Sequence, residues 1–130
     1  MTELDGAIRS TLDEFVEAWD AHEPARMALC WAESGNAIDP WGRYAHGRAA
    51  VEELLAGEHR AAMWDSTYRF LQVVVRELGD DTALAECEAV IEGAHAPNGR
   101  SYTLPHEVSA VLRYDGGVWR FLSLHPSFRA

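Results

Sequence analysis

The stretch Tyr102–His125, YTLPHEVSAVLRYDGGVWRFLSLH, decides the fold class of this chain. Residues 102–114 predict a long strand. Asp115-Gly116-Gly117 is the signal of a tight turn, and residues 118–125 have strand character again. The stretch therefore predicts a long antiparallel β-hairpin.

Two more strands are predicted ahead of this hairpin. Residues 67–78 are rich in β-branched and aromatic side chains, and a Gly79-Asp80-Asp81 turn separates them from a strand over residues 82–94. Pro97-Asn98-Gly99 marks the turn that leads into the hairpin. Consecutive strands joined by short turns indicate an antiparallel sheet.

The first half of the chain has helical spacing instead. Apolar residues at steps of four and three form one stripe of a helix: Leu4, Ile8, Leu12, Phe15 and Trp19. A second helix is expected from Pro24 to Ser34-Gly35, and a third after Gly47, with a short strand over residues 36–39 between them. Helices followed by strands predict an α+β fold, with three N-terminal helices packed on a curved, mainly antiparallel sheet in one domain over residues 1–130.

Composition narrows the class of protein. Hydrophobic residues make up 48% of the chain, enough for a real core, and no apolar run is long enough to span a bilayer. The net charge of -10 disfavours nucleic acid as a partner, because phosphate groups are repelled. The N-terminus lacks the pattern of a secretory signal, so we expect a cytoplasmic protein.

Two segments are apolar on both faces of their expected strands. They are Val73-Val74-Val75 and Phe121-Leu122-Ser123-Leu124, whereas a half-exposed strand should alternate. Helices cover only one face of such a sheet. A homodimer through the other face is therefore predicted, and an unusually apolar exposed sheet is the alternative.

The order of elements and three local motifs resemble the nuclear transport factor 2-like superfamily. The motifs are Phe15-Val16-Glu17-Ala18-Trp19, Asp39-Pro40-Trp41-Gly42 followed by Gly47-Arg48-Ala49-Ala50-Val51, and Asp115-Gly116-Gly117-Val118-Trp119-Arg120. Within the superfamily, the chain looks most like the SnoaL-like polyketide cyclases and bacterial relatives of ketosteroid isomerases. The resemblance implies a cone-like α+β barrel around a pocket. It says less about activity, because one fold hosts many functions.

Asp39 is the first candidate catalytic residue. It ends the expected short strand and precedes a proline and a glycine loop, at the expected pocket mouth. A carboxylate held against apolar walls has a raised pKa, which suits a general base beside a carbonyl. The resemblance implies the same role, since Asp39 is similar to the general-base aspartate of ketosteroid isomerases. Ordinary turn chemistry before a proline is the alternative.

The same comparison implies that two oxyanion donors of ketosteroid isomerases are missing. Their tyrosine and protonated aspartate fall on Phe15 and Ala110 in this chain. His106 and His125 are candidate replacements, because the hairpin register brings both towards one end of the sheet, where a neutral imidazole can donate or accept a proton. Alternatively, each imidazole bonds only to the backbone. Glu88 pairs with His106 if its face of the strand lines the pocket, and is a solvated side chain otherwise.

Aromatic and other large side chains are expected around the pocket between the helices and the sheet, where they would suit a flat apolar ligand. The candidate substrate-binding residues are Phe15, Trp19, Trp31, Trp41, Tyr44, Met63, Phe70 and Glu88. Side chains at helical spacing can equally be core.

The sequence thus predicts an acid–base enzyme for a small apolar, carbonyl-containing molecule, of cyclase, isomerase, dehydratase or epoxide-hydrolase type. Asp39, His106 and His125 are the expected catalytic residues. No metal-ligand spacing, nucleophile elbow or phosphate loop is present, so no metal or other cofactor is expected. The alternatives are a non-catalytic binding or dimerisation module of the same fold, or a structural subunit of a larger complex.

Overall fold

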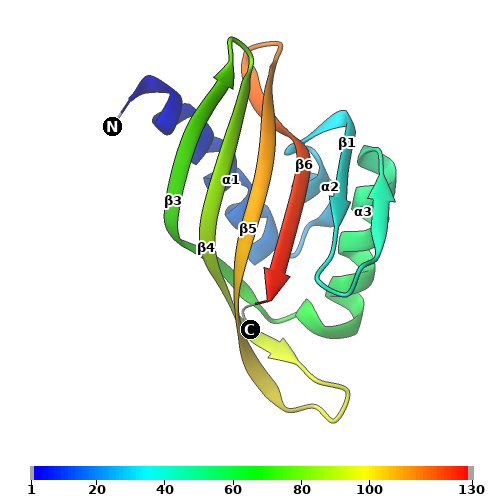
Figure 1. Cartoon of the computed structure of the whole chain (residues 1–130). Coiled ribbons are helices and arrows are strands. Elements are labelled where there is room, and N and C mark those ends of the chain that lie inside the picture. Colours follow the sequence, from blue (N-terminus) through cyan, green and yellow to red (C-terminus); the bar gives the residue numbers. More distant parts are fainter. Residues whose placement is uncertain (1, 129–130) are drawn as a thin grey trace.

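The computed structural model describes residues 2–128 as helices packed on one face of a curved six-stranded sheet (Figure 1). The helical elements are α1 (Glu3–Asp20), α2 (Pro24–Ala28), α3 (Arg48–Glu58) and a π-helical turn, η1 (His59–Met63). The strands are β1 (Trp31–Ile38), β2 (Tyr44–His46), β3 (Thr67–Gly79), β4 (Thr82–His95), β5 (Ser101–Asp115) and β6 (Val118–Phe128). Their order in the sheet is β2-β1-β6-β5-β4-β3. Only the β1–β6 pair is parallel among these strands, so the predicted α+β fold with a mainly antiparallel sheet is confirmed.

The first helix forms as its sequence predicts. The hydroxyl of Thr2 accepts a hydrogen bond from the Asp5 amide at 3.0 Å, and the Asp5 carboxylate accepts one from the Thr2 amide at 3.0 Å. This capping box satisfies amides that have no partner within the helix. The predicted stripe then turns Ile8, Leu12 and Phe15 towards the sheet, where they are almost fully buried. Helix α1 therefore supplies one side of the core.

The segment after α1 differs from the prediction. Helix α2 ends at Ala28, and Trp31 begins a strand instead of continuing the helix that was expected to run to Ser34-Gly35. The reason is the last strand: the Phe121 amide donates to the Cys30 carbonyl at 2.7 Å, and Trp31 pairs with Phe121. Residues 44–46, expected to be part of a loop, form strand β2 at the sheet edge.

Irregular pairing accompanies the curvature of the sheet. The register between β4 and β5 shifts between Ile91 and Ala94, where Gly93 has a positive φ of 82°. A bulge of this kind bends a strand and increases its twist. Beyond it the β4–β5 hairpin extends past the body of the molecule, as the yellow loop in Figure 1 shows.

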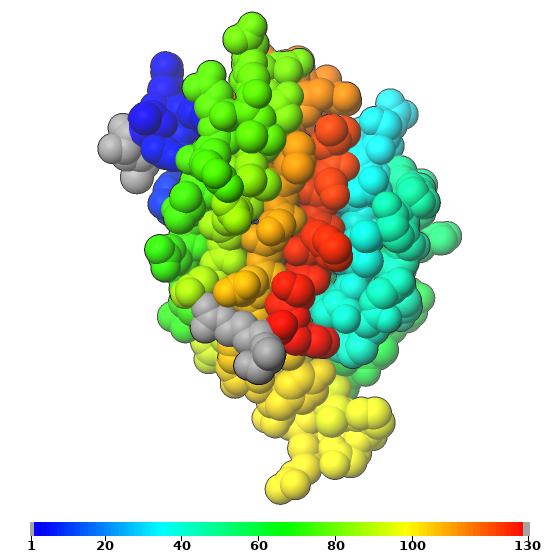
Figure 2. Space-filling view, viewed as in Figure 1, coloured from blue at the N-terminus to red at the C-terminus, as the bar shows by residue number. Residues whose placement is uncertain are grey.

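The face of the sheet opposite the helices is mixed in character. Figure 2 views strands β3 to β6 from this side. Val74 is exposed there, but Glu86 and Glu88 occupy the neighbouring positions of β4, so the surface is not continuously apolar. The homodimer through this face stays a prediction. Within residues 2–128, no helix is both long and apolar enough to cross a membrane.

Candidate functional site

A small cavity of about 60 Å³ lies between helix α1, the α3–η1 segment and the inner face of the sheet. This is several times the space that one ordered water needs. The walls are mainly apolar, and ionisable side chains reach them at four positions: Asp39, Glu58, Tyr68 and His106. These four residues come from the turn after β1, from α3, from β3 and from β5, so several distant elements are needed to bring them together.

Asp39 lies at the cavity immediately after β1, and its side chain is buried. One carboxylate oxygen accepts hydrogen bonds from the amides of Trp41 at 3.0 Å and Arg43 at 2.8 Å. The other oxygen accepts from the Arg43 guanidinium at 2.5 Å. The carboxylate therefore closes the turn over residues 39–43, and both of its oxygens already have donors. This geometry favours the turn-forming alternative over the expected role as a free base.

Glu58 is the carboxyl group at the cavity that the sequence interpretation missed. It is the last residue of α3 and is half-buried. Burial raises the pKa of Glu58 from its usual 4.5 to about 7, and the negative charge of Asp39 adds to this while Arg43 opposes it. Among residues 2–128 no hydrogen bond to the Glu58 carboxyl is found. A carboxyl group with this pKa in an apolar wall can give or take a proton near neutral pH.

The spacing along α3 contains the signal that identifies Glu58. Val51, Leu55 and Glu58 follow at steps of four and three, so all three share the face that packs inward. A glutamate at a buried position of an apolar stripe is unusual, because burying a carboxylate is unfavourable.

Tyr68 and His106 form a second polar group at the cavity. The Tyr68 hydroxyl lies 2.7 Å from His106 Nε2, and His106 Nδ1 lies 3.1 Å from the Leu104 carbonyl. A carbonyl only accepts, so Nδ1 carries the imidazole hydrogen and Nε2 accepts the hydrogen of Tyr68. Burial lowers the pKa of His106 and raises that of Tyr68 well above its usual value. Both groups are therefore neutral near pH 7.

His125 and Glu88 lie away from the cavity, which corrects two sequence expectations. His125 is exposed and pairs with Ser109, whereas His106 is buried on the opposite face of the sheet. The hairpin brings the two histidines towards one end, but their positions differ by an odd number of residues along the paired strands, so they point to opposite faces. Glu88 lies opposite Glu107, on the face away from the helices, and not beside His106.

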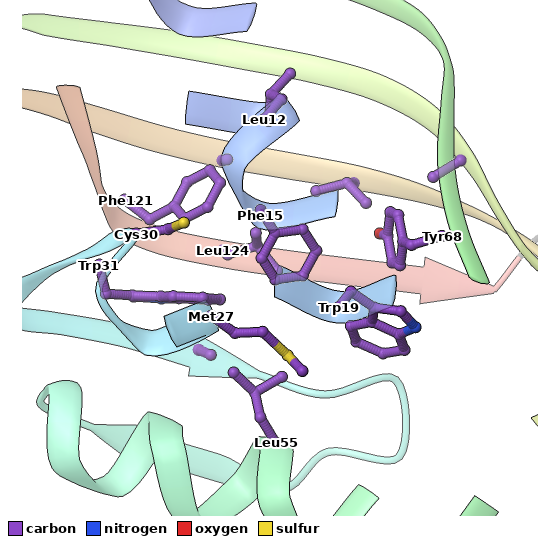
Figure 3. Packing of buried hydrophobic residues seen from close by; sticks show 14 of the residues in the cluster. Leu12, Phe15, Trp19, Met27, Cys30, Trp31, Leu55, Tyr68, Phe121 and Leu124 are labelled. Carbon is purple, nitrogen blue, oxygen red and sulfur yellow. The ribbon is translucent and has the colours of Figure 1, made fainter. Parts of the chain in front are cut away.

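Most of the predicted aromatic wall is found at the cavity. Five of the proposed substrate-binding residues line it: Phe15, Trp19, Trp31, Trp41 and Met63. Phe70 is not at the cavity and instead packs against Tyr68 and Phe15. Tyr44 is exposed on β2, where it stacks on His46. Figure 3 shows the rings of Phe15, Trp19 and Tyr68 close to one another.

A pair of histidines lies behind the Trp19 wall. His59 begins η1, and its ring packs edge-on against Trp19 with centroids 4.4 Å apart. His59 Nδ1 is 3.2 Å from His22 Nδ1, and His59 Nε2 is buried without a hydrogen-bond partner. Burial lowers the pKa of His59 from 6.5 to about 4, and the charge of His22 adds to this effect. Nowhere in residues 2–128 are three or more His, Cys, Asp or Glu side chains grouped to hold a metal ion.

The fold and the cavity define a class: α+β cones with a partly open, mainly apolar pocket between the helices and the sheet. The family model of the SnoaL-like domain matches residues 12–121. The chain therefore belongs to the SnoaL-like family, as the sequence resemblance implied. No curated protein matches the chain.

Solved structures share this fold at low sequence identity. An uncharacterised protein with a cystatin-like fold from Caulobacter vibrioides has a TM-score of 0.88 and 20% identity, over 99% of this chain and 92% of that one. A ketosteroid isomerase-like protein from Erwinia carotovora atroseptica has a TM-score of 0.82 and 16% identity, over 100% and 99%. A candidate scytalone dehydratase from Novosphingobium aromaticivorans has a TM-score of 0.84 and 14% identity, over 95% and 83%. At these identities the likeness establishes the fold alone.

Proposed function

We propose that this protein is an acid–base enzyme for a small apolar molecule, of isomerase or dehydratase type, and that Glu58 is its main proton-transferring group. The observation that carries the proposal is the position of Glu58: a carboxyl group in an apolar wall with a pKa of about 7 and no hydrogen-bond partner among the described residues. General catalysis is most efficient when the pKa lies near the working pH. The fold class also includes a ketosteroid isomerase-like protein and a candidate scytalone dehydratase.

In this proposal the residues take different roles from those expected from the sequence. Glu58 exchanges a proton with a carbon or hydroxyl group of the ligand, and the Tyr68–His106 pair provides the second polar contact. Asp39 and Arg43 form a charged pair that holds the turn at the cavity and influences Glu58. The apolar aromatic walls exclude water, which strengthens the electrostatic contacts inside.

The experiment is a search for proton exchange with simple flat ketones. Each ketone, 2-indanone among them, is incubated in D2O with the protein, and loss of the α-proton signal is followed by NMR. We expect exchange that increases as Glu58 loses its proton around pH 7, and a decrease of roughly 100-fold or more in Glu58→Gln. Glu53→Gln is the matched control, because Glu53 is an exposed residue of the same helix. Equal rates in wild type and Glu58→Gln would remove Glu58 from the mechanism.

A non-catalytic binding module is the second candidate. It is favoured by the hydrogen bonds that already occupy Asp39 and two of the three cavity-lining tryptophans, Trp19 and Trp31. Their indole N–H groups donate to Ser66 and to the Asn36 carbonyl. Binding of several ketones without catalysed exchange of any of them is the result that supports this candidate.

A further inference from the structure

The polar atoms of the cavity differ in whether they have hydrogen-bonding capacity left for a ligand. Trp19 Nε1 donates to the Ser66 hydroxyl at 2.9 Å, and Trp31 Nε1 donates to the Asn36 carbonyl at 3.0 Å. Each indole has one N–H group and no acceptor. Neither of these two tryptophans therefore has a donor left for a ligand. Trp41, the third tryptophan at the cavity, is 55% exposed and packs against Phe128, so its indole is largely in contact with water.

The carboxylate oxygens of Asp39 also have their hydrogen-bond partners within the protein. Its two oxygens accept from two backbone amides and from the Arg43 guanidinium. The carboxylate holds the turn that forms this part of the wall, so a ligand that took one of these donors would also open the turn. Asp39 is a poor contact for a ligand, although it lies at the cavity.

The Tyr68 hydroxyl can still accept a hydrogen bond from a ligand, but it cannot donate one. Because the Leu104 carbonyl fixes the hydrogen of His106 on Nδ1, His106 Nε2 must accept, and the Tyr68 hydrogen points at it. The phenol oxygen keeps its lone pairs. Both residues line the cavity. With its hydrogen directed at His106, the Tyr68 oxygen can serve a ligand as an acceptor and not as a donor.

Glu58 complements Tyr68, because it can donate a hydrogen bond to a ligand. It has no hydrogen-bond partner among residues 2–128, and at pH values below about 7 its carboxyl carries a proton that it can donate. No Lys or Arg side chain lines the cavity among these residues. An anionic ligand would therefore meet no positive charge at the wall, and a cationic one would have to lose its hydration in apolar surroundings.

We propose that the cavity selects an uncharged, ring-sized apolar molecule that carries a hydroxyl group, and that this hydroxyl donates its hydrogen to the Tyr68 oxygen. A second oxygen of the ligand, such as a carbonyl, accepts from Glu58. The ligand class is thus a small hydroxylated, or hydroxy-carbonyl, ring compound. This inference deepens the proposed function, because it names the ligand class of the same site, but it concerns binding and does not require turnover.

The test compares four one-ring probes by calorimetry or NMR titration near pH 6: phenol, anisole, benzoate and benzylamine. Anisole is phenol with its hydroxyl hydrogen replaced by a methyl group, so it cannot donate. We expect phenol to bind roughly three- to tenfold more tightly than anisole, which is the value of one hydrogen bond. Benzoate and benzylamine, both charged, should bind more weakly than phenol. Anisole equal to phenol, tighter binding of either charged probe, or no binding of any probe would overturn the proposal.

Two variants locate the contact. Tyr68→Phe removes the acceptor, so the preference for phenol over anisole should disappear. His106→Leu removes the acceptor of the Tyr68 hydrogen, so that this hydrogen becomes available to a ligand. Benzaldehyde can accept a hydrogen bond but cannot donate one. Its affinity should therefore increase relative to that of phenol. A phenol preference unchanged in both variants contradicts the proposal. Because one variant can fail to fold, a native-like NMR spectrum is required of each, and the wild-type comparison stands without them.

The Glu58→Gln variant separates this inference from the proposed function. The proposed function predicts that it loses proton exchange. The ligand-class inference predicts that it keeps the preference for phenol over anisole, because Tyr68 is unchanged. An unchanged exchange rate in this variant would contradict only the proposed function, and a lost preference for phenol would contradict only the ligand-class inference.

Discussion

At the scale of single residues, the candidate site depends on the charges around Glu58. Asp39 is negative and raises the pKa of Glu58, whereas Arg43 is positive and lowers it. We expect Asp39→Asn to lower the Glu58 pKa below 7 and Arg43→Gln to raise it. Asparagine keeps a side-chain oxygen for the amides of Trp41 and Arg43, so the turn should survive. The measurement is a carbon-13 NMR titration of the glutamate side-chain carboxyls in each variant.

Glu52→Gln is the control for this titration, since Glu52 is an exposed residue of α3 and its removal should leave the Glu58 midpoint in place. Shifts of the same sign in Asp39→Asn and Arg43→Gln would contradict the electrostatic account, because the two variants remove opposite charges.

The sequence predicted only some of these residues, and the reason is physical. Asp39 was found because it precedes a proline, which is a local signal. Its pairing with Arg43 depends on the path of the turn and could not be predicted in the same way. Tyr68 and His106 meet only when β3, β4 and β5 pair in register, so no local pattern reveals their contact. Glu58 was readable from the spacing of α3, but a glutamate at a helix end is usually exposed.

At the scale of elements, Gly35 controls the pairing of β1 with β6. A side-chain carbon there would lie 2.6 Å from the Phe121 carbonyl oxygen and 3.0 Å from that of Ala32. The β1–β6 register shifts between Trp31 and Asn36, around this glycine. We expect Gly35→Ala to destabilise the protein by roughly 1–3 kcal/mol, because backbone atoms must move. Urea unfolding measures the change.

The matched control is Gly6→Ala in α1, where nothing lies within 4 Å of the added carbon. Alanine is the better helix former, so this variant should be more stable by about 0.5–1 kcal/mol. Equal stability of the two variants would show that the close approach of Phe121 is easily relieved.

The elements themselves were largely predictable, with one informative failure. Helix α1 and the four long strands follow from local periodicity and turn residues, and the structure confirms them. The beginning of β1 does not, because Cys30 and Trp31 look like the inner face of a helix. Their pairing with β6, which is distant in sequence, overrides that local preference.

At the scale of the whole molecule, stability should depend on pH through Glu58 and His59, whose pKa values are shifted in opposite directions. Glu58 has its pKa raised to about 7, so its folded form keeps a proton that the unfolded chain releases above pH 4.5. Stability from this group is present below pH 4.5 and is lost as pH rises through 7. His59 has its pKa lowered to about 4 from 6.5, so its contribution is present above pH 6.5 and is lost as pH falls through 4.

These effects overlap, so wild-type stability should vary less with pH than either group alone would require. Relative to wild type, Glu58→Gln should gain stability as pH rises from 4.5 to 7, and His59→Gln should gain it as pH falls from 6.5 to 4. Each relative change should be on the order of 2 kcal/mol across its window. Thermal unfolding at intervals of half a pH unit checks both. Parallel curves for the three proteins would disprove the assignment.

The parallel β1–β6 pair has a consequence for the order in which the protein matures during translation. Ala37 of β1 and Leu124 of β6 are register partners, and both belong to the cavity wall. β6 is the latest of the six strands to leave the ribosome, whereas β3, β4 and β5 can associate with their neighbours as they emerge. Contacts between distant segments are slow to form because a long loop must close. The cavity wall is therefore completed only when β6 pairs with β1, after most of the sheet can already have formed.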